Sequence, residues 1–420
     1  MCYEDKYRLV CAGCGRSFDG CTLTCRHDDA LLRSDYFNTR ISPRNLPGIG
    51  RFHDWLPVLE PITADSGPVT YKSAGLAAEL GLANLHISFN GYCPEKGAFV
   101  KTCSFKEFEA FPTMLRVKEA GEKALVLASA GNTARAFAHV STLTGIDVYI
   151  VVPRKGLNRM WLPEEPTATI HLIEMNSNCD YADTIQFAEK LAKLPGLMPE
   201  GGARNIARRD GMGTVMLDAA FKLRRLPDVY FQAIGSGTGG IAVWEAALRL
   251  IRDGRFGNRL PALHLAQNLP FAPMFNAWNA GRRSIVEELD MPQPKKLIAS
   301  MYSDILSNRK PPYGIGGGVY DALAGTSGRM YGVTNNEAIS ARRLFERLEG
   351  IDIVPPAAVA VAALVKAVES GTVEHDDCIL LNITGGGVER LKKDYKLIEI
   401  KPAASAGADT PVEQVLYETG

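Results

Sequence analysis

Short apolar runs alternate with stretches of helical periodicity along the chain from residue 36 onward. The continuous aliphatic and β-branched runs that predict buried strands are 124–128, 148–152, 170–173 and 378–382. The stretches with helical spacing of apolar residues are 133–144, 182–194, 218–223 and 241–251. Strand–helix alternation is typical of parallel sheets that carry helices on both faces, so we predict an α/β fold.

The length of 420 residues allows two or three domains around a large core. The spacing of the loops predicts two α/β layers with parallel or mixed sheets. The predicted parts are a ribbon-like N-terminal element at 1–35, a larger domain at 36–110 and 226–400, a smaller α/β domain at 111–225 and a loosely held tail at 401–420.

Composition narrows the class of protein. The 47 basic and 47 acidic residues cancel, which argues against a dedicated nucleic-acid or anionic-membrane surface but allows a local basic pocket. The chain has no apolar run of about 18 residues, so no membrane span is expected. The first residues lack the apolar segment of a signal peptide, and we therefore expect a cytoplasmic protein.

Four of the nine cysteines, Cys11, Cys14, Cys21 and Cys25, gather near the N-terminus. In a cytoplasmic chain such a cluster indicates a metal site before disulfides. Zinc needs four ligands, which Cys11, Cys14 and Cys25 could supply together with either Cys21 or His27. A ribbon that has lost its metal fits the pattern equally well, so the sequence alone assigns no metal ligand.

A glycine-rich loop, Gly235-Ser236-Gly237-Thr238-Gly239-Gly240, joins an apolar strand pattern at 229–234 to a helical pattern at 241–246. Glycines allow several backbone N–H groups to face one anion, and the helix N-terminus adds its positive end. This setting favours a phosphate site over a plain tight turn. No Gly-Lys-Ser/Thr follows, which argues against a nucleoside triphosphate.

Two further loops follow predicted strands. Ser129-Ala130-Gly131-Asn132-Thr133 opens a helix, and Asn132 can donate to an oxygen on a bound ring; alternatively, Asn132 or Thr133 only caps that helix. Thr384 ends the strand pattern and precedes three glycines. Its hydroxyl is expected at the carboxyl edge of the sheet, where such folds bind ligands, unless Thr384 is simply a turn residue.

Lys106 lies in an amphipathic segment at 105–111. A lone lysine is most often solvated, but burial would lower the pKa of its amine and free it for bond formation with a carbonyl group. An amine, a loop for a ring, a loop for a phosphate and a hydroxyl for a ring nitrogen are together the parts needed to seat pyridoxal phosphate.

In this order the pieces resemble the tryptophan synthase beta family of pyridoxal-phosphate enzymes, known as fold type II, over about residues 60–395. Ser104-Phe105-Lys106-Glu107 matches the family's Ser-Phe-Lys-Asp, which implies that Lys106 is the cofactor lysine. The resemblance also implies that Asn132 contacts the 3′ oxygen of the ring and that Thr384 contacts the pyridine nitrogen. The implied phosphate-binding residues are Gly235, Ser236, Gly237, Thr238 and Gly239. The cofactor expected from the resemblance is pyridoxal 5′-phosphate.

Within the family the chain is most similar to the threonine synthase group, from which it departs at several positions. The departures are Phe108 in place of an arginine, Gly213 in place of a lysine, Arg135 in place of a small residue and Val-Pro-Pro at 354–356. Together with the segments at 90–94 and 267–273, they imply a transferase that replaces the phosphate of O-phospho-L-serine by sulfite. The implied products are L-cysteate and phosphate, on a route to coenzyme M.

Both implied substrates are anions, so the pocket needs basic groups, for which Arg135 and Lys101 flank the cofactor motifs. The resemblance also implies a homo-oligomer, whereas the neutral charge and the lack of a long apolar run predict that the protein binds neither nucleic acid nor membrane. The alternative enzyme is a threonine synthase acting on O-phosphohomoserine and water. Two other classes are a non-catalytic amino-acid-binding regulator, which the intact lysine and glycine loop disfavour, and a zinc-ribbon nucleic-acid binder, which the neutral charge disfavours.

Overall fold

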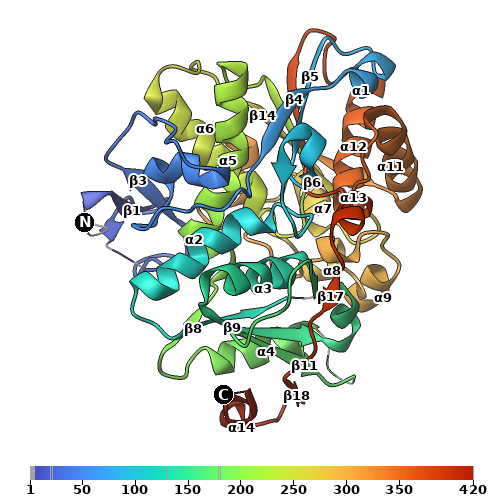
Figure 1. Ribbon diagram of the computed structural model, residues 1–420. Helices are drawn as coiled ribbons and strands as arrows, with labels where there is room; N and C mark the ends of the chain where they lie inside the picture. Colours follow the sequence, from blue (N-terminus) through green and yellow to red (C-terminus); the bar gives the residue numbers. More distant parts are fainter. Residues whose placement is uncertain are drawn as a thin grey trace.

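The computed structural model describes residues 5–18, 20, 22–129, 131–177, 179 and 181–419. Three sheets with three or more strands organise the part of the chain that it describes (Figure 1). The largest has six strands in the order β15-β14-β13-β16-β5-β4, all parallel except that β4 runs antiparallel to β5. Its strands are β4 (Val69–Lys72), β5 (Asn84–Phe89), β13 (Val229–Ala233), β14 (Ala262–Asn268), β15 (Arg329–Val333) and β16 (Cys378–Ile383).

A second sheet of five parallel strands has the order β12-β8-β9-β11-β18. Its strands are β8 (Ala124–Ala128), β9 (Asp147–Pro153), β11 (Ile170–Met175), β12 (Leu197–Pro199) and β18 (Ala404–Ala406). All six residues of β16 and the five central residues of β9 are buried, which explains why both strands read as continuous apolar runs. The sequence therefore predicted the central strands of both sheets correctly.

The segment predicted to be a loosely held tail is instead part of the folded structure. β18 pairs with β11, with Ile173 opposite Ala404, and α14 (Val412–Thr419) follows it. Val415 is completely buried in the cluster of apolar side chains beneath this sheet. The prediction was wrong because the segment is small and weakly patterned, and only its pairing with a distant strand gives it structure.

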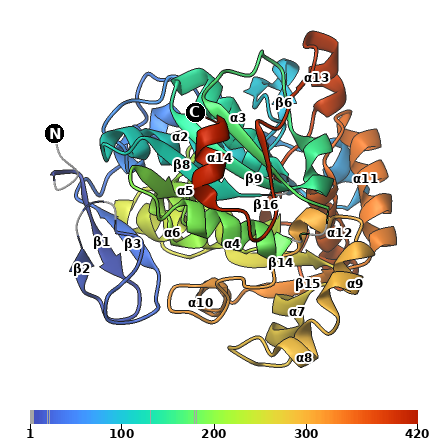
Figure 2. The ribbon, with the colours of Figure 1, turned by 90° about the horizontal axis from the view of Figure 1, so that it is seen from below.

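Helices cover the sheets on both faces (Figures 1 and 2). They are α1 (Gly75–Glu79), α2 (Lys106–Glu119), α3 (Asn132–Thr144), α4 (Tyr181–Leu191), α5 (Ile206–Leu223), α6 (Thr238–Asp253), α7 (Pro273–Asn279), α8 (Glu287–Asp290), α9 (Pro294–Ala299), α10 (Val319–Gly325), α11 (Asn335–Glu349), α12 (Pro355–Glu369) and α13 (Val388–Asp394). The short 3-10 helices are η2 (Gly48–Trp55), η3 (Pro94–Lys96), η4 (Arg154–Arg159), η5 (Gly202–Arg204) and η6 (Asp304–Leu306). Among the described residues, no helix has the length and apolar character to cross a membrane.

The helix predicted at 218–223 is the end of a much longer one, α5. It starts at Ile206, where the Asn205 side chain accepts a hydrogen bond from the backbone N–H of Ala207 and caps the helix. The first turns carry buried charged residues, Arg208, Arg209 and Asp210, that interrupt the apolar periodicity. Their burial depends on ion pairs made with other elements, which the local pattern does not reveal.

The N-terminal ribbon is a three-stranded antiparallel sheet of order β2-β1-β3, with β1 (Tyr7–Cys11), β2 (Ser17–Phe18) and β3 (Leu32–Tyr36). It lies at one edge of the molecule (Figure 2). The hydroxyls of Ser34 and Tyr36 donate to Asp210 on α5 at 2.5 and 2.8 Å, and Arg249 on α6 pairs with the same carboxylate at 2.6 Å. Buried polar contacts therefore fix the ribbon to α5 and α6. The smaller strand pairs are β6 (Tyr92–Cys93) with β7 (Ala98–Phe99), and β10 (Trp161–Leu162) with β17 (Ile398–Glu399).

Helix α5 is packed between α2 and α6 through two glycines. A Cβ atom on Gly211 would lie 1.9 Å from the backbone oxygen of Phe108 on α2, so no larger residue fits there. A Cβ atom on Gly213 would lie 3.1 Å from the backbone oxygen of Ala242 on α6, which is tight but close to ordinary contact. The close approach of α2 and α5 places the N-terminal part of α5 beside Lys106.

We expect Gly211→Ala and Gly213→Ala to differ sharply in stability. Both gain about 1 kcal/mol of helix propensity. Gly211→Ala must push α2 away and should still lower the free energy of unfolding by at least about 2 kcal/mol, because overpacking at a rigid backbone contact is costly. Gly213→Ala should stay within about 1 kcal/mol of the parent protein. Denaturant unfolding measures both, and equal stabilities would contradict the packing described.

Candidate active site

Lys106 is the first residue of α2, and its amine lies inside the protein. Only 18% of its side chain is exposed, and Nζ lies 3.2 Å from Oε2 of Glu109 and 3.9 Å from the sulfur of Met212. Burial lowers the pKa of the Lys106 amine, with a further contribution from Arg208, although Glu109 opposes the shift. The amine is therefore easier to deprotonate than a surface lysine, as bond formation with a carbonyl group requires.

Glu109 joins three helices at this point. Its side chain is completely buried, and besides Lys106 it contacts Nε of Arg208 on α5 at 3.0 Å and the Thr133 hydroxyl on α3 at 3.3 Å. Arg208 also pairs with Glu200 at 2.8 Å. Glu109 was not predicted from the sequence. The available signal was an acidic residue three positions after the lysine, which places both side chains on one helical face.

The end of β16 touches the loop before Lys106. The backbone oxygen of Thr384 accepts a hydrogen bond from the N–H of Phe105 at 3.0 Å, and the oxygen of Cys103 accepts one from Gly386 at 3.2 Å. A Cβ atom on Gly385 would lie 2.3 Å from that same Cys103 oxygen, so only glycine allows this approach. The structure thus brings Thr384, which is 5% exposed, next to the lysine loop.

Asn132 lies on the other side of the lysine loop. Its Oδ1 accepts a hydrogen bond from Nη2 of Arg135 at 2.9 Å, and Arg135 also donates to the backbone oxygens of Thr102 at 2.9 and 3.2 Å and of Arg159 at 3.1 Å. The alternative in which Asn132 or Thr133 caps α3 is not observed, because the helix begins at Asn132 and Gly131 is the capping residue, without a side-chain hydrogen bond.

The glycine loop at 235–237 connects β13 to α6. Gly237 has φ of 82°, in the left-handed region that glycine adopts readily, and a Cβ atom on it would lie 2.3 Å from Cγ2 of Val319. A Cβ atom on Gly239 would lie 2.4 Å from the side-chain nitrogen of Gln232. Ser236 and Thr238 hydrogen-bond to each other through their hydroxyls at 2.8 Å. The first backbone N–H groups of a helix have no partners within the helix, so the start of α6, which directly follows this loop, suits a phosphate group.

Helix η6 packs on both ligand-binding loops predicted from the sequence. The site where Gly131 would carry a Cβ atom is 3.4 Å from Cγ2 of Ile305, and the corresponding site on Gly235 is 3.1 Å from Cα of Leu306. Asp304 holds this helix to Arg159 at 2.8 and 2.9 Å. The asparagine loop of the smaller sheet and the glycine loop of the larger sheet thus share one neighbour, although 104 positions separate Gly131 from Gly235.

A hydrogen-bonded network ties the larger sheet together beneath the glycine loop. Asn90 donates to Asn382 at 2.6 Å, and Asn382 donates to the hydroxyl of Tyr230 at 2.6 Å and to Gln232 at 3.2 Å. All four side chains are buried. Polar residues inside otherwise apolar strands were the available signal for this network, which the sequence analysis did not predict.

Two of the departures from the family pattern are accounted for by packing. Phe108 is completely buried in the main apolar cluster, and Gly213 faces α6 where a longer side chain would meet Ala246. Val354 lies against Gly385, with its Cγ2 atom 3.1 Å from the site of a Cβ atom there. Val354 therefore packs against the glycine segment that contacts the lysine loop.

The two basic residues predicted to hold substrate have protein partners in this structure. Arg135 makes the hydrogen bonds described above and stacks 4.2 Å from the centre of the Trp161 ring. Lys101 pairs with Glu164 at 3.3 Å and lies 5.1 Å from the centre of the Tyr395 ring. A contact of either residue with a substrate stays a prediction.

Comparison with known proteins identifies the class. The family model described as pyridoxal-phosphate dependent enzyme matches residues 98–385. The chain belongs to this family, and its cofactor is pyridoxal phosphate. The structure is similar to that of maize serine racemase, with a TM-score of 0.55 and 16% identity over 77% of this chain and 90% of that one. Serine racemase from Dictyostelium discoideum gives a TM-score of 0.53 over 76% and 93%. At this identity the likeness shows the fold alone.

More similar relatives point to a particular member of the family. The cysteate synthase of Methanosarcina barkeri is 62% identical over 96% of this chain and 97% of its own. The cysteate synthase of Methanocella paludicola is 60% identical over 97% and 96%. That of Methanothrix thermoacetophila is 53% identical over 96% of each chain.

The residues present fit the cofactor. A buried amine with a lowered pKa, a glycine loop at the N-terminus of a long helix, and a threonine beside the lysine loop are the groups that would hold an aldehyde carbon, a phosphate and a ring nitrogen. Neighbouring atoms fill the Cβ positions of Gly235, Gly237 and Gly239, so these positions of the loop favour glycine.

Replacing Glu109 should change the pH at which Lys106 reacts. An amine must be deprotonated to bond to the aldehyde of pyridoxal phosphate. With Lys106 as the predicted cofactor lysine, capture of the cofactor by the apoenzyme should speed up as pH rises through the lowered pKa of Lys106. Glu109 opposes that lowering, so Glu109→Gln should move the rise to lower pH. Stopped-flow absorbance of cofactor capture across pH measures the shift. The exposed Glu122→Gln variant is the control, and an unchanged profile in Glu109→Gln would exclude this role.

Proposed function

We propose that this enzyme replaces the phosphate group of O-phospho-L-serine by sulfite, forming L-cysteate and phosphate as a step towards coenzyme M. The observation that carries the proposal is the identity of 53–62% with relatives named cysteate synthase over nearly the whole of both chains. In this reaction the bond between the β-carbon and the phosphate oxygen breaks, and a bond between the β-carbon and sulfur forms.

Lys106 is the residue we assign to both anchoring and proton transfer. Its amine would hold the cofactor and, once released by the substrate's amino group, remove the proton from the α-carbon and later return it there. Its lowered pKa supports this role, because lowering the pKa increases the deprotonated fraction of the amine, which is the form that acts as a base. When bound, pyridoxal phosphate supplies the electron sink for the α-carbon.

The remaining assigned residues position the cofactor. Thr384 would contact the ring nitrogen with a neutral hydroxyl, which favours expulsion of the β substituent over transamination because it does not stabilise a protonated ring. Asn132 would contact the ring's 3′ oxygen. Gly235, Ser236, Gly237, Thr238 and Gly239 would bind the phosphate. Thr384 contacts the lysine loop directly, and Arg135 links Asn132 to the same loop by donating to both Asn132 and Thr102. Both observations support this assignment.

We keep Arg135 and Lys101 as candidates for holding the substrate anions. Each would have to exchange a protein partner for substrate, Asn132 in the case of Arg135 and Glu164 in the case of Lys101. Three further proposals come from the sequence. A homo-oligomer rests on the family resemblance, the division of the chain into a larger and a smaller domain rests on the spacing of the predicted loops, and a cytoplasmic location rests on the sequence alone.

A substrate panel tests the reaction. With O-phospho-L-serine and sulfite the enzyme should release phosphate and form L-cysteate in equal amounts. O-phosphohomoserine with water should give phosphate and threonine at a far lower rate. Phosphate release and amino-acid products are measured with and without sulfite for each substrate. Faster threonine formation would overturn the proposal in favour of a threonine synthase.

Lys106→Ala should remove both the visible absorbance of the bound cofactor and turnover, the latter by about 10²–10⁴-fold or more. The matched control is Lys118→Ala on the same helix, where the side chain is exposed and pairs with Glu60 at the surface. The Lys118→Ala variant should keep both the visible absorbance of the bound cofactor and the turnover rate. Borohydride reduction followed by peptide mapping identifies the attached lysine independently, and a label on another lysine would refute the assignment.

A further inference from the structure

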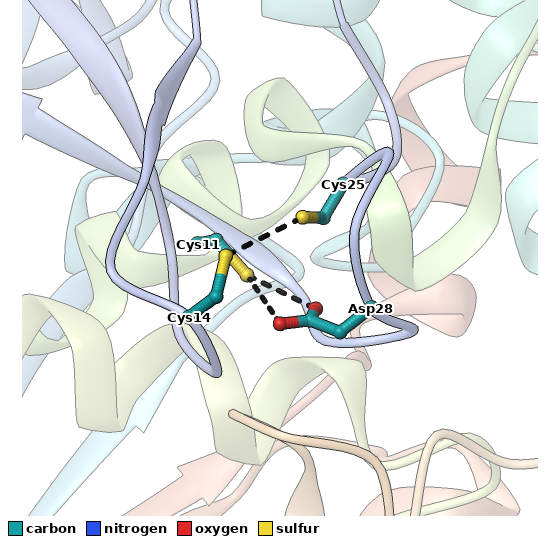
Figure 3. A group of neighbouring side chains, drawn as sticks. All are labelled: Cys11, Cys14, Cys25 and Asp28. Atoms are coloured by element: carbon teal, nitrogen blue, oxygen red, sulfur yellow. Dashed lines mark hydrogen bonds between the residues drawn. The ribbon is translucent and has the colours of Figure 1, made fainter.

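Four potential metal ligands converge in the N-terminal ribbon, far from the groups described above in sequence. Cys11, Cys14, Cys25 and Asp28 each offer one ligand atom, and these atoms all lie within 4.8 Å of one another (Figure 3). Cys11 ends β1 and Cys14 lies in the turn after it, whereas Cys25 and Asp28 come from the loop between β2 and β3. Two loops therefore face each other across the cluster.

We propose that these four side chains bind one Zn²⁺ ion in a structural, tetrahedral site. Zinc–sulfur bonds of about 2.3 Å place two sulfurs of a tetrahedron about 3.8 Å apart. The sulfurs of Cys14 and Cys25 are 3.7 Å apart. The sulfur of Cys11 lies 3.1 and 3.4 Å from the two carboxylate oxygens of Asp28, a spacing that an ion between them can bridge. Three thiolates favour zinc over magnesium or calcium.

Backbone groups support the same ligands. The N–H groups of Gly13 and His27 point at the sulfurs of Cys11 and Cys25 at 3.4 and 3.3 Å, which stabilises thiolates and orients them. The N–H of Ala30 donates to Oδ1 of Asp28 at 2.9 Å. A Cβ atom on Gly13 would lie 2.7 Å from Oδ2 of Asp28, so glycine is required for the loops to close around this point.

The ligand set differs from the one that the cysteine spacing suggested. Nε2 of His27 lies 2.6 Å from Arg16, and its ring lies near Phe18, so His27 has other partners. Cys21 lies outside the described residues. Asp28 takes the fourth position instead, and it escaped the sequence analysis because an aspartate after a cysteine pair carries no distinctive signal.

The proposed site also connects the ribbon to the glycine loop. Leu31, next to the ligand loop, donates its N–H to the backbone oxygen of Gly316 at 2.8 Å, and a Cβ atom on Gly317 would lie 2.8 Å from Cβ of Ala12. Two residues further along, Val319 packs against Gly237 in the loop assigned to the cofactor phosphate. We infer that the metal stabilises the position of residues 316–319, which pack against the glycine loop. This role rests on the proposed phosphate assignment.

Metal analysis of the full-length enzyme tests the site itself. The purified protein should contain close to one zinc per chain by mass spectrometry of the metal. Replacing zinc by Co²⁺ should give the visible bands of tetrahedral cobalt with thiolate charge transfer in the near ultraviolet. Absence of zinc together with an octahedral cobalt spectrum would overturn the proposal. So would a disulfide between Cys14 and Cys25, detected as two fewer titratable thiols in the unreduced protein.

Variants identify the ligands. Cys14→Ser, at an exposed position, should weaken zinc binding by more than about 100-fold, whereas Cys179→Ser should not change it. Asp28→Cys should still bind zinc. In its cobalt form, the thiolate charge-transfer bands should be more intense than in the parent protein, because four thiolates instead of three would bind the ion. Unchanged cobalt bands in Asp28→Cys would remove Asp28 from the site even if the other variants fold poorly.

Chelation of the holoenzyme tests separately whether zinc stabilises the segment that packs against the glycine loop. Removing zinc should raise the dissociation constant for pyridoxal phosphate several-fold, and restoring zinc should reverse the change. If zinc is bound but its removal leaves the dissociation constant for pyridoxal phosphate unchanged, the effect of zinc on the glycine loop is excluded, whereas the metal site itself is retained. The reaction proposed above would be unaffected by either result, because the substrate panel tests it on the zinc-loaded enzyme.

Discussion

The buried carboxylate of Glu109 is the contact on which the arrangement around Lys106 depends. It binds the lysine on its own helix, the guanidinium of Arg208 on α5 and the hydroxyl of Thr133 on α3. A buried charge is tolerated only when such partners surround it, and removing one partner of a buried pair typically costs about 3–5 kcal/mol. The three helices are therefore held in one geometry by the same group that influences the protonation of the amine.

Helix α5 carries this constraint across the molecule. Arg208 faces Lys106 and Glu109, whereas Arg209 and Asp210 face the ribbon and α6, where Arg209 pairs with Glu245 at 2.9 Å. Arg209 also donates to the backbone oxygen of Leu32 in the ribbon. The turn of α5 that carries Arg208, Arg209 and Asp210 thus has charged partners on opposite sides. The ribbon and the lysine loop are therefore both positioned by α5.

Features with local signatures could be predicted from the sequence. Buried strands such as β9 and β16 are continuous apolar runs, and the loop at 235–237 combines glycines with a strand before it and a helix after it. Features set by distant partners could not. The first turns of α5, the pairing of β18 and the place of Asp28 beside three cysteines each depend on residues far away in the chain. The candidate site follows the same division, since Lys106 has a motif and Glu109 has none.

The pairing of β18 with β11 has a consequence for the order in which the protein is built. Residues 404–406 leave the ribosome after every strand of the larger sheet, yet they cover the edge of a sheet whose other strands end at residue 199. Until then β11 presents unpaired backbone groups along an apolar parallel edge, the kind of surface that joins other chains. The nascent chain therefore carries this open edge through the synthesis of about half its length, which exposes the strand to misassembly.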